Sequence, residues 1–562
     1  MIKYPLDYNP IVEYWELIKS GKETVSEKIR KTYKKIMFDL SDKNTDFFYS
    51  NSRANHIIEF IENFCRHSKG KMGGRPVILE LWEKAMLATI FGFIDIEGNR
   101  KYREALLVVG KKNGKSLLAS CVGLYMQIAD GEPGPEIYAV ATKKDQAKII
   151  WQEAKRMVRK SPALHKRIKP LVAELSSELF NDGTFKPLAS DKDTLDGLNV
   201  YCVLMDETHQ WKLGRQLFDI MADGTSARSQ PLIFMTSTAG TIREDLYDEK
   251  YDEARNIING YFDEQGYKND RFIAFIYELD KRNEWPDSKC WKKANPGLGT
   301  IKNLQTLKEK VEKATYNHNL VKNLLCKEFN IPETSSEAWL NWEQLNNTAT
   351  FDVEKLKPLY GIGGADLSRT TDLTAAKVIF MLPDDTKIYV LQMYWIPEDL
   401  LEKRVNEDKI KYDVWRDKGY LRTCQGNSIN PKDITTWFIE VQEKLDIYIP
   451  YIGYDSWSAK YWVDEMSDYF GRDSMISVHQ GKKTLSLPMG QLGQDLDSKK
   501  IIYNDHPIDK WCLANTSIET DKNGNIQPHK TNNQRMRIDG TAALLNAYVV
   551  LMDNFDDYMS KI

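Results

Sequence analysis

The chain lacks the features that mark an exported or membrane-bound protein. No run of eighteen apolar residues occurs anywhere, and the N-terminal stretch MIKYPLDYNPIVEYWELIKSGK has no apolar signal core. A bilayer-spanning helix needs about 20 mostly apolar residues, and an export signal needs a shorter apolar core. The sequence therefore predicts no export and no membrane partner.

Cysteine is also scarce. The seven cysteines stand singly, no C-x-x-C pair occurs, and their number is odd. Isolated thiols of this kind argue against a disulfide framework and against a zinc site. Reduced thiols fit a cytosolic compartment.

Neither sign of charge is in marked excess. The 562 residues include 78 Lys and Arg against 81 Asp and Glu, which gives a formal net charge of −3. A near-neutral total neither indicates nor excludes a nucleic-acid partner, because a basic face can be local. The length predicts about two to four domains.

The first 335 residues combine helical and α/β patterns. Residues 1–70 carry apolar residues at helical spacing and are expected to form a helical N-terminal region. Across 71–335, short apolar runs alternate with helical stretches, which is typical of a parallel sheet buried on both faces. We expect a doubly wound α/β domain there. Its strands are predicted at ALLVV (105–109), EIYAVA (136–141), VYCVLMD (200–206) and PLIFMTSTAG (231–240).

A second α/β pattern follows a polar stretch. Small polar residues in 336–356 predict a linker, and 357–562 is expected to be the second domain. Alternating residues in the middle two of its four apolar runs predict paired antiparallel strands. A helix is expected near 540–552. The runs are YGIGGAD (360–366), TAAKVIFM (374–381), KIYVLQMYWI (387–396) and YIGYD (451–455).

The stretch VVGKKNGKS, Val108 to Ser116, resembles a phosphate-binding loop with one glycine displaced. The usual pattern G-x-x-x-x-G-K-[ST] requires a glycine at 109, but that position is Val and the glycine follows at 110. Such a loop surrounds an anion with backbone N–H groups, a helix N-terminus, a lysine and a Mg²⁺-binding hydroxyl. A lysine-rich surface turn remains the alternative. The expected ATP-binding residues are Gly110, Lys111, Lys112, Asn113, Gly114, Lys115 and Ser116, with Ser116 also a Mg²⁺ ligand.

Two later motifs fall at the ends of apolar runs, where ligands bind in open α/β sheets. Asp206 is placed to hold Mg²⁺, and Glu207 to polarise the attacking water. In MTSTAG, small hydroxyl residues are placed to sense the γ-phosphate; these coupling residues are Thr236, Ser237 and Thr238. Each motif alone also fits an ordinary strand-to-loop turn, but the three in this order predict an ATPase.

The sequence Asp206-Glu207-Thr208-His209 also resembles the DExH box of helicases. A helicase–nuclease is therefore an alternative. A helicase of that class requires a second motor domain with an arginine motif such as Q-x-x-G-R-x-x-R, and 350–562 contains none.

Three aspartates in the second half stand at the ends of elements. Asp366 ends YGIGGAD with Asp372 close behind, Asp455 ends YIGYD, and Asp539 opens the final helix. Three carboxylates can bind two Mg²⁺ or Mn²⁺ ions about 3.5–4 Å apart for attack on a phosphodiester. Each aspartate also fits a turn or helix-cap position. Together they favour a nuclease.

In order along the chain, these motifs resemble the large terminase subunit of tailed bacteriophages. The resemblance covers nearly the whole length, from EFIENFCRHSKG through LLVVGKKNGKS, LMDETHQW, SQPLIFMTSTAG, GGADLSRTTDLTA and YDSWSA to MRIDGTAALLNAY. It implies an N-terminal P-loop ATPase of the ASCE type, which forms rings, and a C-terminal RNase H-like nuclease. It also implies cleavage of concatemeric DNA and ATP-driven translocation of double-stranded DNA into the prohead.

The resemblance assigns roles and partners. Lys115 and Ser116 match the Walker A lysine and hydroxyl, and Trp82-Glu83 stands where the family commonly has Trp-Gln for the adenine contact. Implied cofactors are ATP with Mg²⁺ and two divalent metals in the nuclease. Implied partners are double-stranded DNA, the portal protein, a small terminase subunit and further copies in a ring. The implied location is the cytoplasm of the infected bacterial host, with a transient stay at the portal vertex of the prohead. The remaining matches are Asp206 in Walker B, Glu207 as the catalytic glutamate, Thr236–Thr238 as the coupling motif, and Asp366, Asp455 and Asp539 as the metal-binding carboxylates.

Two contacts are less determined by the sequence. Ring ATPases often complete a neighbour's site with an arginine, for which Arg228 is the candidate and Arg243 the second choice. The basic segment 143–169 is expected to grip DNA phosphates, although a solvated helix face explains it equally. Its candidates are Lys143, Lys144, Arg156, Arg159 and Lys160. A non-catalytic, capsid-associated DNA-binding protein is the remaining alternative.

Overall fold

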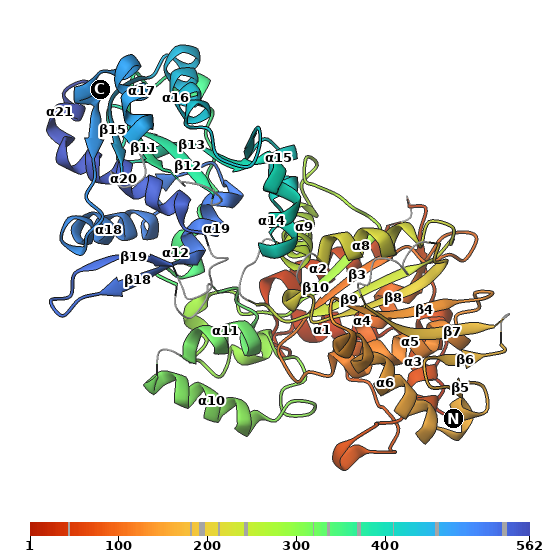
Figure 1. The fold of residues 1–562 in the computed structure, drawn as a ribbon. Coiled ribbons are helices and arrows are strands. Elements are labelled where there is room, and N and C mark those ends of the chain that lie inside the picture. The colour runs from red at the N-terminus through yellow and green to blue at the C-terminus, as the bar shows by residue number, and fades with distance from the viewer. Residues whose placement is uncertain are drawn as a thin grey trace. The chain divides into compact units, whose positions relative to one another are not determined.

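The computed structural model divides into two compact units, Met1–Pro332 and Glu333–Ile562 (Figure 1). Each unit is described by itself. The structure describes residues 1–42, 45–179, 182–189, 197–211, 214–240, 245–317, 320–333, 338–367, 373–408, 410–455, 460–530 and 537–562.

A mainly parallel sheet forms the centre of the first unit, as the apolar runs predict. Among the described residues its strand order is β10-β3-β9-β8-β4-β7-β6-β5, and the strands from β10 to β7 are parallel. β6 and β5 add an antiparallel edge. The strands are β3 (Glu104–Val108), β4 (Glu136–Ala141), β5 (Lys169–Pro170), β6 (Leu175–Ser177), β7 (Gly183–Ala189), β8 (Val200–Asp206), β9 (Leu232–Ser237) and β10 (Phe272–Ile276).

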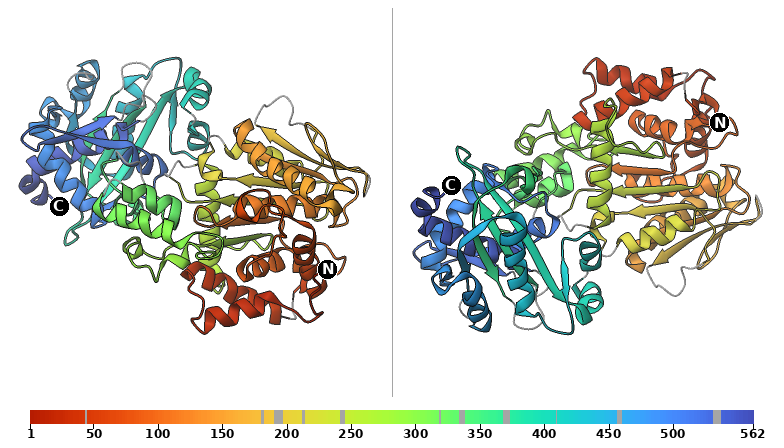
Figure 2. Two further views of the ribbon diagram at one scale, coloured as in Figure 1. Left: turned by 90° about the horizontal axis from the view of Figure 1, so that it is seen from below. Right: turned by 90° about the horizontal axis from the view of Figure 1, so that it is seen from above.

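Helices cover both faces of this sheet (Figures 1 and 2). Alternate residues of a strand point to opposite faces, so Leu107 joins one core cluster while Leu106 and Val108 join the other. The first cluster takes residues from α3 (Asn51–Phe64), α4 (Leu81–Gly92), α5 (Lys115–Ile128) and α6 (Lys144–Lys160), and the second from α8 (Gly214–Asp223) and α9 (Leu246–Gly260).

The N-terminal helices share the core of this sheet. Ile11 of α1 (Pro10–Lys19) and Ile29 of α2 (Glu27–Ser41) lie in the same cluster as Phe275 of β10. Ser26 donates its hydroxyl hydrogen bond to the Ile276 carbonyl at 2.8 Å. The short strands β1 (Phe48–Tyr49) and β2 (Phe93–Ile94) pair antiparallel beside them.

Residues 279–332, named here the α10–α11 segment, carry a small core of their own. It includes Leu279, Trp291 and Phe329. Its helices are α10 (Leu304–Tyr316) and α11 (Val321–Phe329). The segment ends where the second unit begins.

A mixed sheet forms the centre of the second unit. Its described order is β14-β13-β12-β11-β15-β16, with β17 beside β13. The β12–β13 pair is antiparallel, as predicted for the middle two apolar runs. The β11–β12 pair is also antiparallel, whereas β11–β15 is parallel. The strands are β11 (Tyr360–Asp366), β12 (Thr374–Phe380), β13 (Ile388–Pro397), β14 (Arg422–Cys424), β15 (Tyr448–Tyr454), β16 (Met475–Ser477) and β17 (Ile501–Ile502).

Helices also flank the second sheet, and the segment expected to be a linker packs against it. The described residues 338–356 form α12 and α13, and Leu345 of α12 is fully buried. Asn347 donates a backbone hydrogen bond to the Tyr503 hydroxyl at 3.0 Å. The helices are α12 (Trp342–Leu345), α13 (Val353–Leu356), α14 (Leu401–Asp408), α15 (Tyr412–Asp417), α16 (Pro431–Leu445), α17 (Lys460–Phe470), α18 (Lys482–Asp497), α19 (Pro507–Asn515), α20 (Asp539–Asp553) and α21 (Phe555–Met559), beside the hairpin β18 (Thr516–Thr520) and β19 (Ile526–Lys530).

In the described part of the chain, every helix is too short or too polar to cross a bilayer.

Candidate ATP and nuclease sites

The loop after β3 has the backbone of a phosphate-binding loop. Gly114 caps α5 with a φ of 87°, a left-handed conformation that glycine adopts without a steric penalty. Val109 continues the strand, because its N–H donates to the Ser237 carbonyl at 3.2 Å. Lys111 and Lys112 are exposed at the turn. The displaced glycine therefore leaves the strand–loop–helix arrangement intact.

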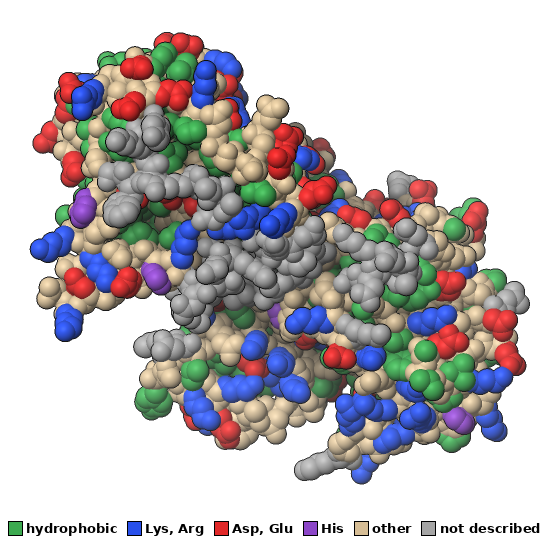
Figure 3. Space-filling model, in the orientation of Figure 1, with side chains coloured by type: hydrophobic (Ala, Val, Ile, Leu, Met, Phe, Trp, Pro, Cys, Tyr) green, Lys and Arg blue, Asp and Glu red, His purple; other side chains and the backbone are tan. Residues whose placement is uncertain are grey.

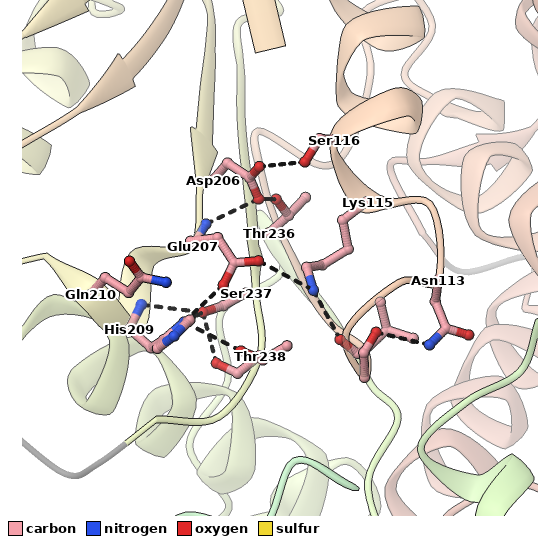
Figure 4. A network of polar contacts seen from close by, with 12 residues as sticks. Asn113, Lys115, Ser116, Asp206, Glu207, His209, Gln210, Thr236, Ser237 and Thr238 are labelled. Carbon is pink, nitrogen blue, oxygen red and sulfur yellow. Dashed lines mark hydrogen bonds and ion pairs between the residues drawn. The ribbon is translucent and has the colours of Figure 1, made fainter. Parts of the chain in front are cut away.

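Lys115 and Ser116 reach the end of β8 from the first turn of α5 (Figure 4). The Ser116 hydroxyl donates to Asp206 Oδ2 at 2.6 Å. Lys115 is buried, donates to the Val109 carbonyl at 3.2 Å and lies 3.6 Å from Glu207 Oε1. Four of the predicted residues thus converge at the carboxyl edge of the parallel strands.

Asp206 is held from two sides. Thr236 of β9 donates to Asp206 Oδ1 at 2.7 Å, opposite the Ser116 bond to the other oxygen. Burial, and then the charge of Glu207, raise the pKa of Asp206, while the two hydroxyl bonds act to lower it. A buried carboxylate with fixed oxygens beside a hydroxyl is a donor set that fits Mg²⁺.

His209 contacts both Glu207, the candidate catalytic glutamate, and the coupling motif. No role for His209 is predicted from the sequence. Its Nδ1 lies 3.3 Å from Glu207 Oε2 and 3.1 Å from Ser237 Oγ. Thr238 Oγ1 is 3.4 Å from the same nitrogen. Glu207 has a left-handed φ of 52°, which turns the chain sharply after β8. The only sequence signal for His209 is its place in the DETH stretch.

Trp82 and Glu83 of α4 occupy different positions. Trp82 is buried in the core with its ring edge-on to Tyr277, at 5.4 Å between centroids. Glu83 lies beside the phosphate loop, since its Oε1 is 3.7 Å from where a Cβ on Gly114 would stand. Burial raises the pKa of Glu83 to about 8. Glu83, rather than the Trp82 ring, is the residue that approaches the loop.

Arg228 lies at the amino ends of the strands and contacts the segments that precede two of them, β4 and β8. Its guanidinium lies 2.9 Å from Glu132 and donates to the carbonyls of Pro133, Gly134 and Asn199, which precede β4 and β8. The nucleotide candidates lie at the other end of this sheet, at the carboxyl ends of β3, β8 and β9. Within this chain, the Arg228 guanidinium holds the segment before β4 and the segment before β8 together. The second choice, Arg243, lies outside the described residues.

The basic candidates lie along α6 and its flanks. Lys143, Arg159 and Lys160 are exposed, and Arg156 is 3.7 Å from Glu153. Lys144 opens α6, and its side chain lies outside those described. Figure 3 shows Lys and Arg side chains gathered over this face of the first unit.

Two of the three carboxylate candidates follow neighbouring strands of the second sheet, and the third opens the helix α20 that packs on those strands. Ala365 and Tyr454 are opposite each other in the parallel β11–β15 pair, so Asp366 and Asp455 leave neighbouring strands at the same edge. Asp539 is the first residue of α20 and is 5% exposed. Among the described residues, no three His, Cys, Asp or Glu side chains are close enough to hold one metal ion. Asp372 lies outside those residues.

Glycines let α20 cross this edge at close range. A Cβ on Gly364 would lie 2.4 Å from the Ala543 carbonyl oxygen, and one on Gly453 would lie 2.5 Å from that of Asn546. Asn546 donates its amide to the Ala365 carbonyl at 2.8 Å. Gly364 in the YGIGGAD pattern therefore allows α20 to pack closely on the sheet next to Asp366.

The two α/β units are those of an ATPase of the P-loop class and an RNase H-like nuclease. The family "Terminase large subunit, ATPase domain" matches residues 81–256, and "Terminase large subunit, endonuclease domain" matches 267–554. The large terminase subunit of Enterobacteria phage HK97 is 26% identical over 512 residues, covering 88% of this chain and 94% of the relative. The large subunit of Lactococcus phage p2 is 24% identical, covering 96% and 98%. The HK97 large terminase crystal structure has a TM-score of 0.47 at 23% identity, covering 89% of this chain and 99% of that one.

Because the endonuclease family alone matches more than half of its length, the chain belongs to the terminase large subunits. It is an ATPase and an endonuclease of viral DNA packaging. The helicase and non-catalytic alternatives are thereby set aside. The endonuclease match begins before β10, a strand of the first unit's sheet.

Proposed function

We propose that Lys115, Ser116, Asp206 and Glu207 carry out ATP hydrolysis in the first unit. The observation that supports this best is the 2.6 Å bond between Ser116 and Asp206, which joins the start of α5 to the end of β8. Ser116 and Asp206 would hold Mg²⁺, since both offer hard oxygen ligands. The bound ion would neutralise charge on the phosphate oxygens.

The remaining steps are assigned to groups already in place. Lys115 places a buried positive charge against the outer phosphates. Glu207 accepts the proton of the attacking water. Thr236 fixes the Asp206 carboxylate, and Ser237 and Thr238 contact His209 next to Glu207. A change at the γ-phosphate that moves Glu207 would then be passed through His209 to Ser237 and Thr238, which lead into the loop after β9.

The test separates the two activities. Glu207→Gln should abolish ATP hydrolysis and leave cutting of plasmid DNA intact, whereas Asp366→Ala should do the reverse. Glu264→Gln, on an exposed turn of the first unit, is the matched control. Full ATP turnover by Glu207→Gln would refute its role as the base.

We propose that Asp366, Asp455 and Asp539 bind two divalent metals for DNA cleavage. Support comes from the neighbouring strand ends that carry Asp366 and Asp455, from the packing of α20, which Asp539 opens, on those strands, and from the all-oxygen donor set, which suits Mg²⁺ or Mn²⁺. Cutting by Asp455→Asn and Asp539→Asn, assayed in Mn²⁺, should fall to background. Asp473→Ala, an exposed aspartate of the same unit, should cut normally.

A basic surface of the first unit is the proposed grip for double-stranded DNA. Beside the α6 candidates lies the loop 66–76, where Lys69 and Arg75 are exposed. The two segments touch, because a Cβ on Gly73 would lie 3.3 Å from Lys160 Nζ. Ser68 also bonds Glu153 of α6. The loop therefore extends the basic face of the helix.

Phosphate contacts predict a measurable salt dependence. Replacing Lys160 or Arg159 with Gln should reduce the slope of log affinity against log salt by about 0.9 for each lost contact. Lys289→Gln, an exposed change in the α10–α11 segment, should leave the slope unchanged. Equal slopes of log affinity against log salt for all variants would mean that the α6 face is exposed to solvent and does not contact DNA.

Ring assembly on the portal, with a small subunit selecting DNA in the host cytoplasm, completes the proposal. Arg228 would then act on the site of a neighbouring copy, which requires release of its carbonyl contacts. Mixing Arg228→Ala with Glu207→Gln subunits on proheads tests this. Packaging restored by the mixture supports action between copies, and no restoration refutes it.

A further inference from the structure

The phosphate loop is bonded along its length to the α10–α11 segment. The Gly110 N–H donates to the Ala294 carbonyl at 2.9 Å, and the Lys111 N–H donates to the Lys327 carbonyl at 2.8 Å. The amide of Asn113 donates to Asn295 Oδ1 at 2.9 Å. A segment that follows much later in the chain thus bonds to Gly110, Lys111 and Asn113 of the loop.

Asn295 is the centre of this contact. Its side chain is fully buried, and its amide donates to the carbonyls of Trp291 and Glu328 at 3.1 and 2.9 Å. Its oxygen accepts from Asn113 and from Lys302, the latter at 2.5 Å. One amide therefore ties the phosphate loop to the end of α11.

The displaced glycine of the phosphate loop is explained by the same packing. A Cβ on Gly110 would stand 2.3 Å from Asn295 Oδ1 and 2.6 Å from the Glu328 carbonyl oxygen. Both distances are shorter than any van der Waals contact permits. Position 110 has to be glycine because the α10–α11 segment lies against it.

A second buried asparagine makes the equivalent contact to the coupling motif. Asn330, with a left-handed φ of 56°, accepts a hydrogen bond from the Ala239 N–H at 3.1 Å. Its amide donates to the Tyr277 carbonyl at 2.6 Å. Cys326 of α11 also donates to the Gly240 carbonyl. Ala239 and Gly240 directly follow the Thr236–Thr238 hydroxyls.

We propose that Asn295 and Asn330 are positioning residues for ATP hydrolysis. Through the end of α11 they hold the phosphate loop and the residues after Thr238 at a fixed position relative to each other. The proposal rests on the proposed ATP site. Asn295 is expected to set the loop that binds the phosphates, and Asn330 the loop that follows Ser237 and Thr238. The two asparagines should therefore affect different kinetic constants.

The test is ATPase kinetics of full-length variants. Asn113→Ala and Asn295→Ser should raise the KM for ATP about tenfold and lower kcat. Asn330→Gly keeps the left-handed backbone and removes only the amide, so it should lower kcat about tenfold with little change in KM. A displacement of about 1 Å in a catalytic group is enough for effects of this size. Asn303→Ala, at the exposed N-cap of α10, should leave both constants unchanged, because among the described residues the Asn303 side chain bonds only within its own helix, to the Thr306 N–H.

Two results would overturn the proposal. A lower melting temperature with unchanged kcat and KM would mean that both asparagines are only structural. Additive effects of Asn113→Ala and Asn295→Ser in the double variant would mean that the pair does not act as a unit. Failure of the proposed ATP site is distinguishable, because Lys115→Ala would then retain hydrolysis whatever the asparagine variants do.

Discussion

His209 Nδ1 lies 3.3 Å from Glu207 Oε2, in contact with the Ser237 hydroxyl of the neighbouring strand. The imidazole thus stands between the proposed base and the loop that follows β9. The backbone N–H of His209 also donates to Ser237 Oγ at 3.2 Å, which fixes the turn after β8. Glu207 is aimed by its neighbours as well as by its own backbone.

His209→Ala should lower kcat for ATP about tenfold to a hundredfold and leave the KM nearly unchanged, because the ring contacts the base rather than the phosphate loop. Steady-state ATPase measurements at several ATP concentrations give both constants. His165→Ala, an exposed histidine after α6, is the control. A change in KM alone would place His209 in nucleotide binding instead.

We expect Glu83 to make the first unit less stable as the pH rises toward 8. Its pKa is raised from 4.5 to about 8 by burial, so the folded protein keeps a proton that the unfolded chain releases. The free energy of unfolding therefore falls as pH rises from about 4.5 to 8 and then levels off. Glu83→Gln should remove this slope and raise the melting temperature at pH 8 by several degrees, with little effect at pH 5. Thermal unfolding across this pH range, with Glu264→Gln as control, measures it; parallel curves for wild type and Glu83→Gln would contradict the prediction.

The sequence predicted the strands that carry the ATP-site candidates, because the candidates stand at the ends of continuous apolar runs. Lys115, Asp206 and Thr236 converge for that reason alone. It gave no sign of Asn295 or Asn330, since neither lies in a periodic pattern and their partners are far along the chain. The polar stretch before β11 was expected to be a linker, yet it is part of the second unit. Leu345 lies in its core and Asn347 bonds the Ile501 carbonyl, contacts that composition does not reveal.

Lys377 and Asp509 form a buried ion pair in the second unit. Lys377 of β12 is fully buried and Asp509 of α19 nearly so. Burial acts to raise the pKa of Asp509, but the charge of Lys377, together with the contacts that Lys377 and His506 make to the carboxylate, outweighs it and holds the pKa below its usual value. Lys377→Met leaves an uncompensated buried charge and should cost roughly 3–5 kcal/mol of unfolding free energy.

Denaturant unfolding of Lys377→Met, Asp509→Leu and the double variant tests that prediction. The double variant should recover most of the loss, since neither charge is then left alone. Lys355→Met removes an exposed pair with Asp352 and should leave the free energy of unfolding nearly unchanged. A double variant as unstable as the sum of the singles would argue against a coupled pair.

Gly364→Ala should displace α20 from the edge that carries Asp366. The added methyl would lie 2.4 Å from the Ala543 carbonyl oxygen and 2.6 Å from the Ala547 nitrogen, so the helix backbone has to move. Cutting in Mg²⁺ should fall at least tenfold, because Asp539 at the start of α20 moves relative to Asp366. Gly490→Ala, where nothing lies within 4 Å of the new methyl, should cut normally. ATP hydrolysis of both variants, measured on the same preparations, should match the wild type. Normal cutting by Gly364→Ala, with a lowered melting temperature as evidence that the helix had shifted, would mean that cleavage does not depend on the placement of Asp539.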